Sequence, residues 1–294
     1  MSGGAPGAVG RGIGLFVLAW LVIPAMDASA KMLGNLGYGV LLVAFARFAA
    51  NLVLALPLAL ALGRRGSGFR HSGLQTVRAL ALVGATVLFF QGLRTLPLAD
   101  ALAVYFVYPF LVTVLAPLVL GEGVGWRRWS AVGVGFCGAL LVVRPGLAEV
   151  DAGVLPVLGA AVCFAVYNLL TRRLSGRADP WWTLAFQALV GSLVLAPFAV
   201  LEWSVPDGRA LALVAVVGVA SVVGHWLVIR AYDFAPAAVL APFAYVEMVA
   251  AAAYGYAVFG DFPDAWTWAG IAVIVSSGAY VAVRERRAGV PGQR

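Results

Sequence analysis

Residues Val40–Leu62 read VLLVAFARFAANLVLALPLALAL, and this stretch decides the fold class. Its only charged residue is Arg47, and every other residue except Asn51 and Pro57 is apolar. A helix needs about 20 mostly apolar residues to cross the hydrocarbon core of a bilayer. Because water is absent there, the backbone must satisfy its own hydrogen bonds, which a helix does within one segment. The stretch therefore predicts a transmembrane helix.

The composition of the whole chain agrees with this interpretation. The chain is 63% hydrophobic and 11% charged, whereas a soluble domain carries about 25% charged residues. The net charge of +7 comes from Arg residues that separate apolar runs, and they form no basic patch with interleaved aromatics, so we expect no nucleic-acid partner. Cys137 and Cys163 both lie inside apolar runs, which indicates neither a disulfide nor a metal site.

Breaks at Gly, Pro and charged clusters divide the chain into ten predicted helices. They cover residues 12–31, 37–62, 74–93, 98–120, 126–143, 153–171, 181–201, 210–230, 235–259 and 265–283. Ala28-Ser29-Ala30 imitates a signal-peptide cleavage site, but Asp27 and Lys31 flank it, so we expect the first helix to be retained. The sequence thus predicts an all-α, multi-pass integral membrane protein.

The Lys and Arg residues between the helices predict the orientation, because they accumulate on the cytoplasmic side. With the N-terminus inside, fifteen of them fall on the cytoplasmic side. The other side holds four: Lys31, Arg94, Arg144 and Arg209. Both termini are therefore expected in the cytoplasm, and the number of helices is even. We expect the protein in the inner membrane of a bacterium.

The chain also repeats itself. Residues 92–99 (GLRTLPLA) are echoed by residues 228–235 (VIRAYDFA), and each copy is followed by an apolar helix that ends in Gly and an acid, at Gly121-Glu122 and Gly260-Asp261. We assign residues 1–146 and 151–287 to two five-helix repeats and residues 288–294 to a cytoplasmic tail. With five helices per copy, the second copy enters from the opposite side. Inverted repeats are typical of alternating-access carriers, whose substrate site lies near the midplane.

Short motifs follow one another in a recognisable order. These are Leu98-Ala99-Asp100-Ala101, Tyr108-Pro109, Gly121-Glu122, Trp126, residues 133–138 (GVGFCG) and Arg144-Pro145-Gly146. The order resembles the first half of an EamA-type carrier of the drug/metabolite transporter superfamily. Residues 25–31 (AMDASAK) and Arg47-Phe48 resemble the branch that includes S-adenosylmethionine uptake carriers and riboflavin importers.

The resemblance carries its own expectations. It implies ten helices in two inverted five-helix halves, and a central cavity lined by helices one, three, four, six, eight and nine. It also implies uptake, although relatives move amino acids, nucleobases, cofactors and drugs. The sequence departs from the family pattern at Gly260-Asp261, where Gly-Glu is usual, and this shortens one carboxylate.

Glu247 is the sharpest candidate for a substrate contact. It is expected near the middle of helix 235–259, where an ionised side chain costs on the order of 3 kcal/mol and should face the protein interior or a wet cavity. It contacts a substrate cation, takes up a proton, forms a structural pair with an Arg, or is a neutral side chain that hydrogen-bonds a neighbouring helix. The side chains expected to stack on or hydrogen-bond a planar or cationic ligand beside it are Trp20, Gln91, Tyr105 and Tyr245.

Further charged residues are candidates for a gate or for coupling. Asp27 and Lys31 lie four residues apart on one helix face, which fits either an intrahelical ion pair or half of an outer gate completed by Arg47. Arg94 and Asp100 flank the turn between helices three and four, and Arg230 and Asp233 occupy the repeated position. They are either interface residues or paired gate charges. A wider polar and aromatic set comprises Tyr108, Tyr167, Asn168, Gln187, His225 and Trp226.

These features predict a secondary-active or facilitative transporter of a small, cofactor-like metabolite that is cationic or planar. No phosphate-binding Gly-x-x-x-x-Gly-Lys-[Ser/Thr] motif is present in the sequence, so a substrate or proton gradient would drive transport. Export of amino acids or toxic amphiphiles is the alternative within transport. A membrane enzyme acting on a lipid-linked substrate would need clustered acids, a metal set or a nucleophile with its base, and we expect no enzyme, catalytic residue, cofactor or metal. A scaffold would have little reason to carry Glu247 and Arg47 inside helices.

Overall fold

A computed structural model describes residues 6–64, 71–120, 126–143, 151–174, 177–234 and 241–288, and all regular structure in these ranges is helical. The first part of the chain forms α1 (Pro6–Asn35), α2 (Val40–Leu62), α3 (Ser72–Gly92), α4 (Leu98–Tyr105), α5 (Tyr108–Leu120) and α6 (Trp126–Val143). The second part forms α7 (Val154–Leu174), α8 (Pro180–Leu201), α9 (Gly208–Phe234), the 3₁₀ helix η1 (Ala241–Tyr245), α11 (Val246–Tyr254), the π-helix η2 (Gly255–Phe259) and α12 (Ala265–Ala288).

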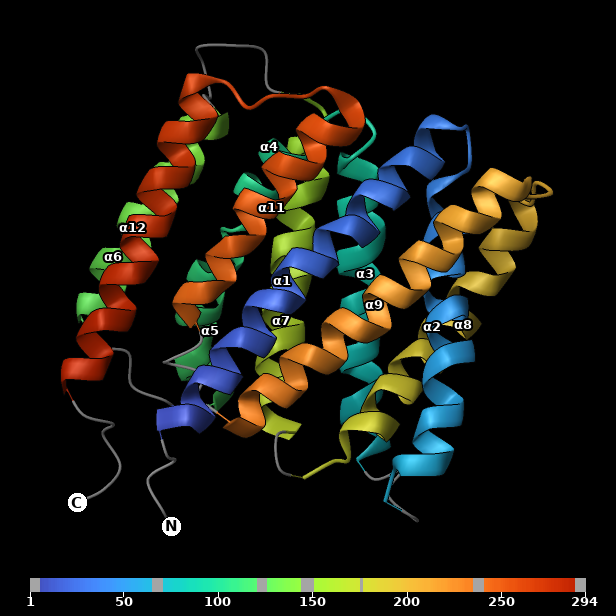
Figure 1. Ribbon diagram of the computed structural model, residues 1–294, viewed down its shortest axis with the longest axis horizontal. Helices are drawn as coiled ribbons and strands as arrows, with labels where there is room; N and C mark the ends of the chain where they lie inside the picture. Colours follow the sequence, from blue (N-terminus) through green and yellow to red (C-terminus); the bar gives the residue numbers. More distant parts are fainter. Residues whose placement is uncertain are drawn as a thin grey trace.

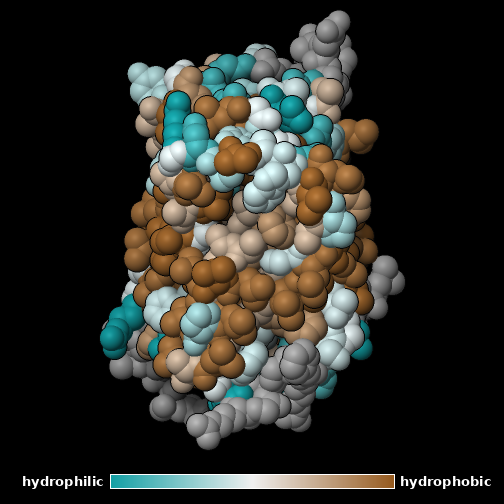
Figure 2. Space-filling view, turned by 90° about the vertical axis from the view of Figure 1, so that its right-hand side faces the viewer, coloured by the Kyte–Doolittle hydropathy of each residue, from teal (hydrophilic) through white to brown (hydrophobic). Residues whose placement is uncertain are grey.

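The helices form a bundle whose outer surface is apolar. Helices α1, α2, α3, α7, α8 and α9 are long and apolar enough to cross a membrane, and shorter apolar helices accompany them. Large apolar side chains point outward along these helices; Val53 and Leu155, for example, are 72% and 76% exposed. Figure 2 shows a broad hydrophobic band between more hydrophilic ends. Such a surface is unsuited to water and matches the hydrocarbon of a bilayer.

Helices from the two parts of the chain pair with one another. The closest neighbours are α1 with α9, α2 with α8, α3 with α7, and α6 with α12. In chain order, the counterparts are α1 and α7, α2 and α8, α3 and α9, and α6 and α12. If each helix is exchanged for its counterpart, the α1–α9 pair becomes the α7–α3 pair, while the α2–α8 and α6–α12 pairs are unchanged. The same exchange relates the α1–α11 contact to the α7–α5 contact. The packing of the bundle therefore has the pattern of an approximate two-fold axis.

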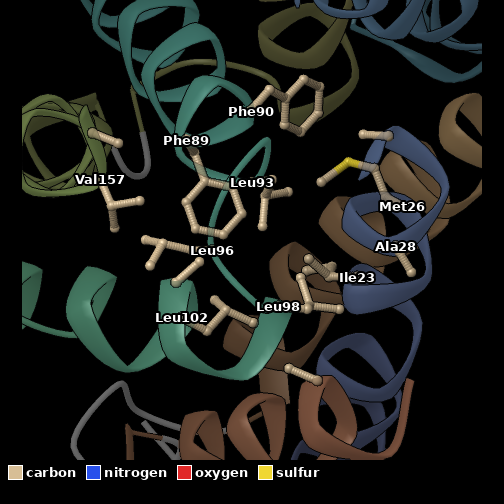
Figure 3. Close-up of a cluster of buried hydrophobic side chains, with 14 of the residues drawn as sticks. Ile23, Met26, Ala28, Phe89, Phe90, Leu93, Leu96, Leu98, Leu102 and Val157 are labelled. Carbon is tan, nitrogen blue, oxygen red and sulfur yellow. The ribbon is translucent and has the colours of Figure 1, made fainter. Parts of the chain in front are cut away.

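The directions of the helices can be followed in Figure 1. Helix α1 begins and α12 ends at the same end of the bundle, which we call the N-terminal end. Helix α3 ends at the opposite end of the bundle (Figure 1). Helix α7 begins at that same end, because Gly153, just before α7, lies against Gly92 at the end of α3. Figure 3 shows the buried apolar side chains Phe89, Leu93 and Leu98 packed between α1 and α7.

The predicted continuous helix over residues 98–120 is wrong. It is broken at Phe106 and Val107 into α4 and α5. The physical reason is Pro109, which has no N–H to donate to the carbonyl of Tyr105 and whose ring would clash with that carbonyl in a continuous helix. In the second position of α5 the missing N–H costs nothing, because the first N–H groups of a helix have no partner within it.

The predicted helix over residues 235–259 is also interrupted. Its described part, residues 241–259, runs from the 3₁₀ helix through α11 to the π-helix, and Pro242 lies in the 3₁₀ segment. Residues 235–240 lie outside the described ranges, as do the motif residues Gly121, Glu122 and 144–146. At the end of η2, Gly260 has a φ of 75°, a left-handed conformation that a glycine adopts without strain. It turns the chain so that Asp261 follows directly at the rim of the bundle.

Candidate functional site

Three charged side chains from three helices lie buried in the interior. Asp27 of α1, Arg47 of α2 and Glu247 of α11 are 4%, 6% and 4% exposed. Asp27 interacts electrostatically with both Arg47 and Glu247. We call these three residues the central charge cluster. Charged groups so far from water are costly unless they are paired or bind a ligand, so the cluster is the first candidate for a functional site.

Arg47 is held in place by neutral groups around it. It donates a hydrogen bond to Oγ1 of Thr86 on α3, and that hydroxyl in turn donates to the carbonyl of Leu82 at 2.8 Å. The guanidinium also lies 5.5 Å and 5.9 Å from the ring centroids of Phe48 and Phe90. These contacts hold the side chain. Asp27 interacts with it electrostatically, but the two form no ion pair in the described part of the chain.

The two acids of the central charge cluster differ from Arg47 in this respect. Within the described part of the chain, no group donates a hydrogen bond to the side chain of Asp27 or of Glu247. Buried carboxyl groups are normally hydrogen-bonded. Among the described residues, the two acids therefore lack the hydrogen bonds that buried carboxyl groups normally have.

Aromatic rings pack in a chain beside the central charge cluster. We call them the aromatic array: Phe89, Tyr105, Phe106, Tyr108, Phe164, Tyr167 and Tyr245. Tyr105 is at its centre, with ring centroids 4.9 Å from Phe89 and 5.2 Å from Phe164, and it interacts electrostatically with Glu247. The break between α4 and α5 makes the array possible, because it turns Tyr105, Phe106 and Tyr108 toward one another.

The five residues predicted to line the substrate site have different positions. Tyr105 and Tyr245 belong to the aromatic array, and Tyr245 packs on Phe106 with centroids 5.6 Å apart. Trp20 lies edge-on to Phe16 at 5.7 Å, and its indole N–H is buried without a hydrogen-bond partner among the described residues. Gln91 is exposed near the end of α3 and is not part of this arrangement.

Lys31 pairs with an acid far away in the sequence. Its Nζ lies 3.3 Å from Oδ2 of Asp261 and donates to the carbonyl of Leu96 at 2.9 Å. It also lies 4.8 Å from the centroid of the Phe259 ring. The intrahelical pair with Asp27 is not formed, because the long side chain of Lys31 extends toward the end of the bundle, as lysines near a polar boundary do. Asp261, whose role the sequence did not reveal, thus ties the end of η2 to α1.

The structure describes contacts or exposure for three of the other gate candidates. Arg94 is exposed beside a small hollow that it lines together with Lys31. Asp100 accepts a hydrogen bond from the hydroxyl of Thr267 at 2.8 Å, which links α4 to α12. Arg230 is exposed and lies 5.6 Å from the ring centroid of Phe234. The side chain of Asp233 is outside the described part of the structure.

Arg78 is a buried charge. The prediction of orientation places it among the fifteen Lys and Arg residues of the cytoplasmic side, but it lies within α3 and is 2% exposed. It donates hydrogen bonds to Thr171 at 2.7 Å, to Tyr167 at 3.0 Å and to Gln187 at 2.8 Å. The sequence did hold a signal, since Arg78 falls inside the helix predicted over residues 74–93. Without it, the loop charges still greatly outnumber those of the other side.

Comparison with known proteins adds to this geometry. The EamA-like transporter family matches residues 10–144 and 151–283. An S-adenosylmethionine uptake transporter of Rickettsia felis is 28% identical over 277 residues, which cover 94% of each chain. A riboflavin transporter of Vibrio cholerae is 29% identical over 81% of each chain. The pseudopaline exporter CntI of Pseudomonas aeruginosa is 28% identical over 90% of this chain and 93% of its own.

The fold is also found in a solved crystal structure. That structure superposes on 96% of this chain and 98% of its own with a TM-score of 0.70 and 19% sequence identity. At this identity the likeness concerns the fold alone. The family model, in contrast, matches the amino-acid sequence itself, in both parts of the chain. The protein therefore belongs to the EamA-like transporter family and is an EamA-type carrier of the drug/metabolite transporter superfamily.

Proposed function

We propose that the protein is a secondary carrier that moves a small, cofactor-like metabolite with a cationic or planar group across the bacterial inner membrane. The observation that carries the proposal is the pair of buried acids, Asp27 and Glu247, which lack hydrogen-bond donors in the described structure and lie beside the aromatic array. The names of the relatives, which describe uptake of S-adenosylmethionine and of riboflavin, support both the substrate class and the direction.

The proposed chemistry follows from these groups. A cationic centre would be held by the two carboxylates and by the electron-rich face of Tyr105, because cations bind over aromatic faces when water is excluded. A planar ring would stack on the same aromatic side chains. When the site is empty, protonation of Glu247 or Asp27 would remove a buried negative charge, so a proton is a natural coupling ion.

Alternating access would use the paired arrangement of the two halves. The pattern of helix contacts, with α1 on α9 and α3 on α7, supports two repeats that are inverted in the membrane. Ten spans with both termini in the cytoplasm are proposed from the apolar segments and from the distribution of Lys and Arg residues. Lys31 lies in the last part of α1 and Asp261 follows η2, and α1 ends at the end of the bundle opposite to the one where it begins (Figure 1). The Lys31–Asp261 pair would close the periplasmic side by holding α1 against η2, and its opening would admit substrate from outside.

Export is the second candidate, because one relative is named as an exporter. The same site could serve either direction. A carrier without its own energy source moves substrate down the combined gradients of substrate and coupling ion, so the gradients would decide the direction.

Counterflow in liposomes tests the carrier function. Purified protein is reconstituted with an unlabelled compound inside, and uptake of the labelled compound is followed for S-adenosylmethionine, riboflavin, several amino acids and a quaternary amine. We expect saturable uptake of at least one compound, and its loss in Glu247→Gln. Glu202→Gln is the matched control, because Glu202 is exposed at the end of α8 and the amide can still accept the hydrogen bond from Leu42.

The two variants separate the outcomes. Uptake that survives Glu247→Gln would leave a carrier but remove Glu247 from its mechanism. Folded wild-type protein that exchanges no compound of the panel would contradict the proposed function itself.

A further inference from the structure

Arg78 is a buried cation without a buried anion beside it. Its hydrogen bonds go to the hydroxyls of Thr171 and Tyr167 and to the amide oxygen of Gln187, all of them neutral. The guanidinium carbon also lies 4.6 Å from the centroid of the Tyr167 ring. Among the described residues the one ion pair is Lys31 with Asp261, so no described carboxylate balances Arg78.

The guanidinium is also incompletely bonded. Its Nη1 is buried and has no hydrogen-bond partner in the described structure, although Arg78 is only 2% exposed. A buried charge with an unpaired N–H group is costly. The planar guanidinium fork matches two oxygens of one anion. Both its charge and its free N–H groups therefore call for an oxyanion that the chain itself does not provide.

The position of Arg78 relates it to the central charge cluster. The rings of Tyr167, Phe164 and Tyr105 follow one another with centroids 5.5 Å and 5.2 Å apart. At one end of this path Arg78 lies over the ring of Tyr167. At the other end the rings continue from Tyr105 through Tyr108 and Phe106 to Tyr245, two residues before Glu247. The aromatic array thus runs between a cationic pole at Arg78 and an acidic pole at Glu247.

We propose that Arg78, with Tyr167, Thr171 and Gln187, binds an oxyanion of the transported metabolite, so that the substrate is zwitterionic. Its carboxylate or phosphate would bind Arg78, its cationic group would bind Glu247 and Asp27, and its planar part would lie on the aromatic array. This inference rests on the proposed carrier function and specifies its substrate class.

The helices that supply this subsite suggest why it matters for transport. Arg78 lies on α3, whereas Tyr167 and Thr171 lie on α7 and Gln187 lies on α8. Helices α3 and α7 pack along one another, and α3 also contacts α8. An oxyanion bound here would therefore touch both parts of the chain near the N-terminal end of the bundle, where α3 and α8 begin (Figure 1). Its binding energy would depend on how the two parts are placed.

Pairs of compounds that differ in one anionic group test the inference. The pairs are S-adenosylmethionine with its decarboxylated form, tryptophan with tryptamine, and riboflavin 5′-phosphate with riboflavin. Dissociation constants are measured on the detergent-purified full chain by thermal shift, and counterflow is measured for the same six compounds. In the wild type we expect the anionic member of at least one pair to bind about tenfold or more tightly, as for a charge-assisted hydrogen bond.

Gln187→Glu is the decisive variant, because it places a carboxylate where the amide oxygen now accepts from Arg78 at 2.8 Å. This internal anion should occupy Arg78, abolish the preference for the anionic member, and leave the affinity of the anion-free member unchanged. The new ion pair should keep the protein folded, which thermal unfolding checks. Arg78→Lys should keep a reduced preference, because it retains a positive charge without the fork.

Each result has a definite meaning. A preference that persists in Gln187→Glu, or equal affinities within every pair in the wild type, would overturn the inference. If the inference were overturned in this way while compounds of the panel still exchanged in counterflow, the carrier function would stand and only the zwitterionic substrate class would fall. Absence of counterflow for all six compounds would overturn both.

Discussion

At the scale of single residues, the free-energy cost of burying the charge of Asp27 depends on the charge of Arg47, and the reverse also holds. Arg47→Met keeps most of the side-chain volume but leaves Asp27 buried without its cation. Removing one member of a buried ion pair costs about 3–5 kcal/mol. Arg47 and Asp27 interact electrostatically without forming an ion pair in the described structure, so we expect a smaller fall in the free energy of unfolding, about 1–3 kcal/mol. Adding Asp27→Asn should restore part of this loss, because Glu247 is then the one acid of the central charge cluster left without a cation.

Thermal or denaturant unfolding of both single variants and the double variant measures this coupling. Leu42→Ala, at another buried position of α2, serves as a control that changes apolar packing without changing charge. If the losses of the two single variants simply add in the double variant, Asp27 and Arg47 do not stabilise one another.

The Lys31–Asp261 pair should contribute little to stability and more to transport. Asp261 is 37% exposed, and an ion pair that solvent reaches is worth about 0.5–1 kcal/mol. Asp261→Asn should therefore lower the free energy of unfolding by less than about 1 kcal/mol, while it changes the rate of exchange because the periplasmic contact is weakened. Asp261→Glu keeps the charge and should preserve the rate.

The measurements are unfolding by heat and initial rates of counterflow. An unchanged rate in Asp261→Asn would show that this pair is not a gate. Lys31→Met is expected to be more severe than Asp261→Asn, because Lys31 also donates to the carbonyl of Leu96 and lies against Phe259.

These residues also show what the sequence could reveal about the site. Glu247 and Arg47 were predictable because a charge within an apolar run has a known cost of insertion. Arg78 was misjudged because a charge near the end of a helix can equally reach the interface, and only the packing of α3 against α7 and α8 buries it. Asp261 was missed because its partner, Lys31, lies on the first helix of the other half.

At the scale of helices, α6 and α12 approach closely at two glycines. A Cβ added to Gly138 would lie 2.9 Å from the carbonyl oxygen of Gly270 and 2.8 Å from the side chain of Ile274. Small residues permit such contacts between membrane helices. Gly138→Ala should therefore push the helices apart and lower the free energy of unfolding by about 1–3 kcal/mol.

Gly133→Ala is the matched control on the same helix, because no described atom outside the local helix backbone lies within 4 Å of a Cβ built there. It should be neutral or slightly stabilising, since alanine favours a helix over glycine. The comparison by thermal unfolding would contradict the close packing of α6 and α12 if both variants behaved alike.

The helix boundaries illustrate how far local patterns reach. The long apolar segments were predictable because hydrophobicity and length decide them; α2, α3 and α8 begin and end within a few residues of the predicted ranges. The break between α4 and α5 was not located, because a proline near the middle of an apolar segment can either kink a helix or end it. The tertiary packing of Tyr105, Tyr108 and Phe164 favours the break here.

At the scale of the whole molecule, the sequence predicted two repeats but not the two-fold pattern in which their helices pair. The repeated motifs predicted two related halves, but they could not tell that α1 would pack along α9 and α3 along α7. Those contacts depend on the shapes of the helix surfaces, such as the close approach of Gly224 on α9 to Ile23 on α1. The central charge cluster arises from the same packing, because its three members come from α1, α2 and α11.

Inverted repeats make a prediction about which loops face which side of the membrane. If the halves are inverted, the connection after α1 lies outside, whereas the connection after its counterpart α7 lies inside. Single cysteines are introduced by Leu36→Cys and Arg177→Cys, both at exposed positions, in a chain that also carries Cys137→Ser and Cys163→Ser. In intact cells, we expect a membrane-impermeant thiol reagent to label Leu36→Cys and to spare Arg177→Cys.

Two further positions complete the test. Trp203→Cys, after α8, should be labelled in intact cells, and Arg64→Cys, after α2, should be labelled only once the cells are permeabilised. The reason is that the positive charges of the chain accumulate at the connections that contain Arg64 and Arg177, and such connections stay in the cytoplasm. Labelling of Leu36→Cys and Arg177→Cys from the same side would mean that the two halves run parallel. The proposed alternating access, which uses the inverted arrangement of the two halves, would then lose its structural basis.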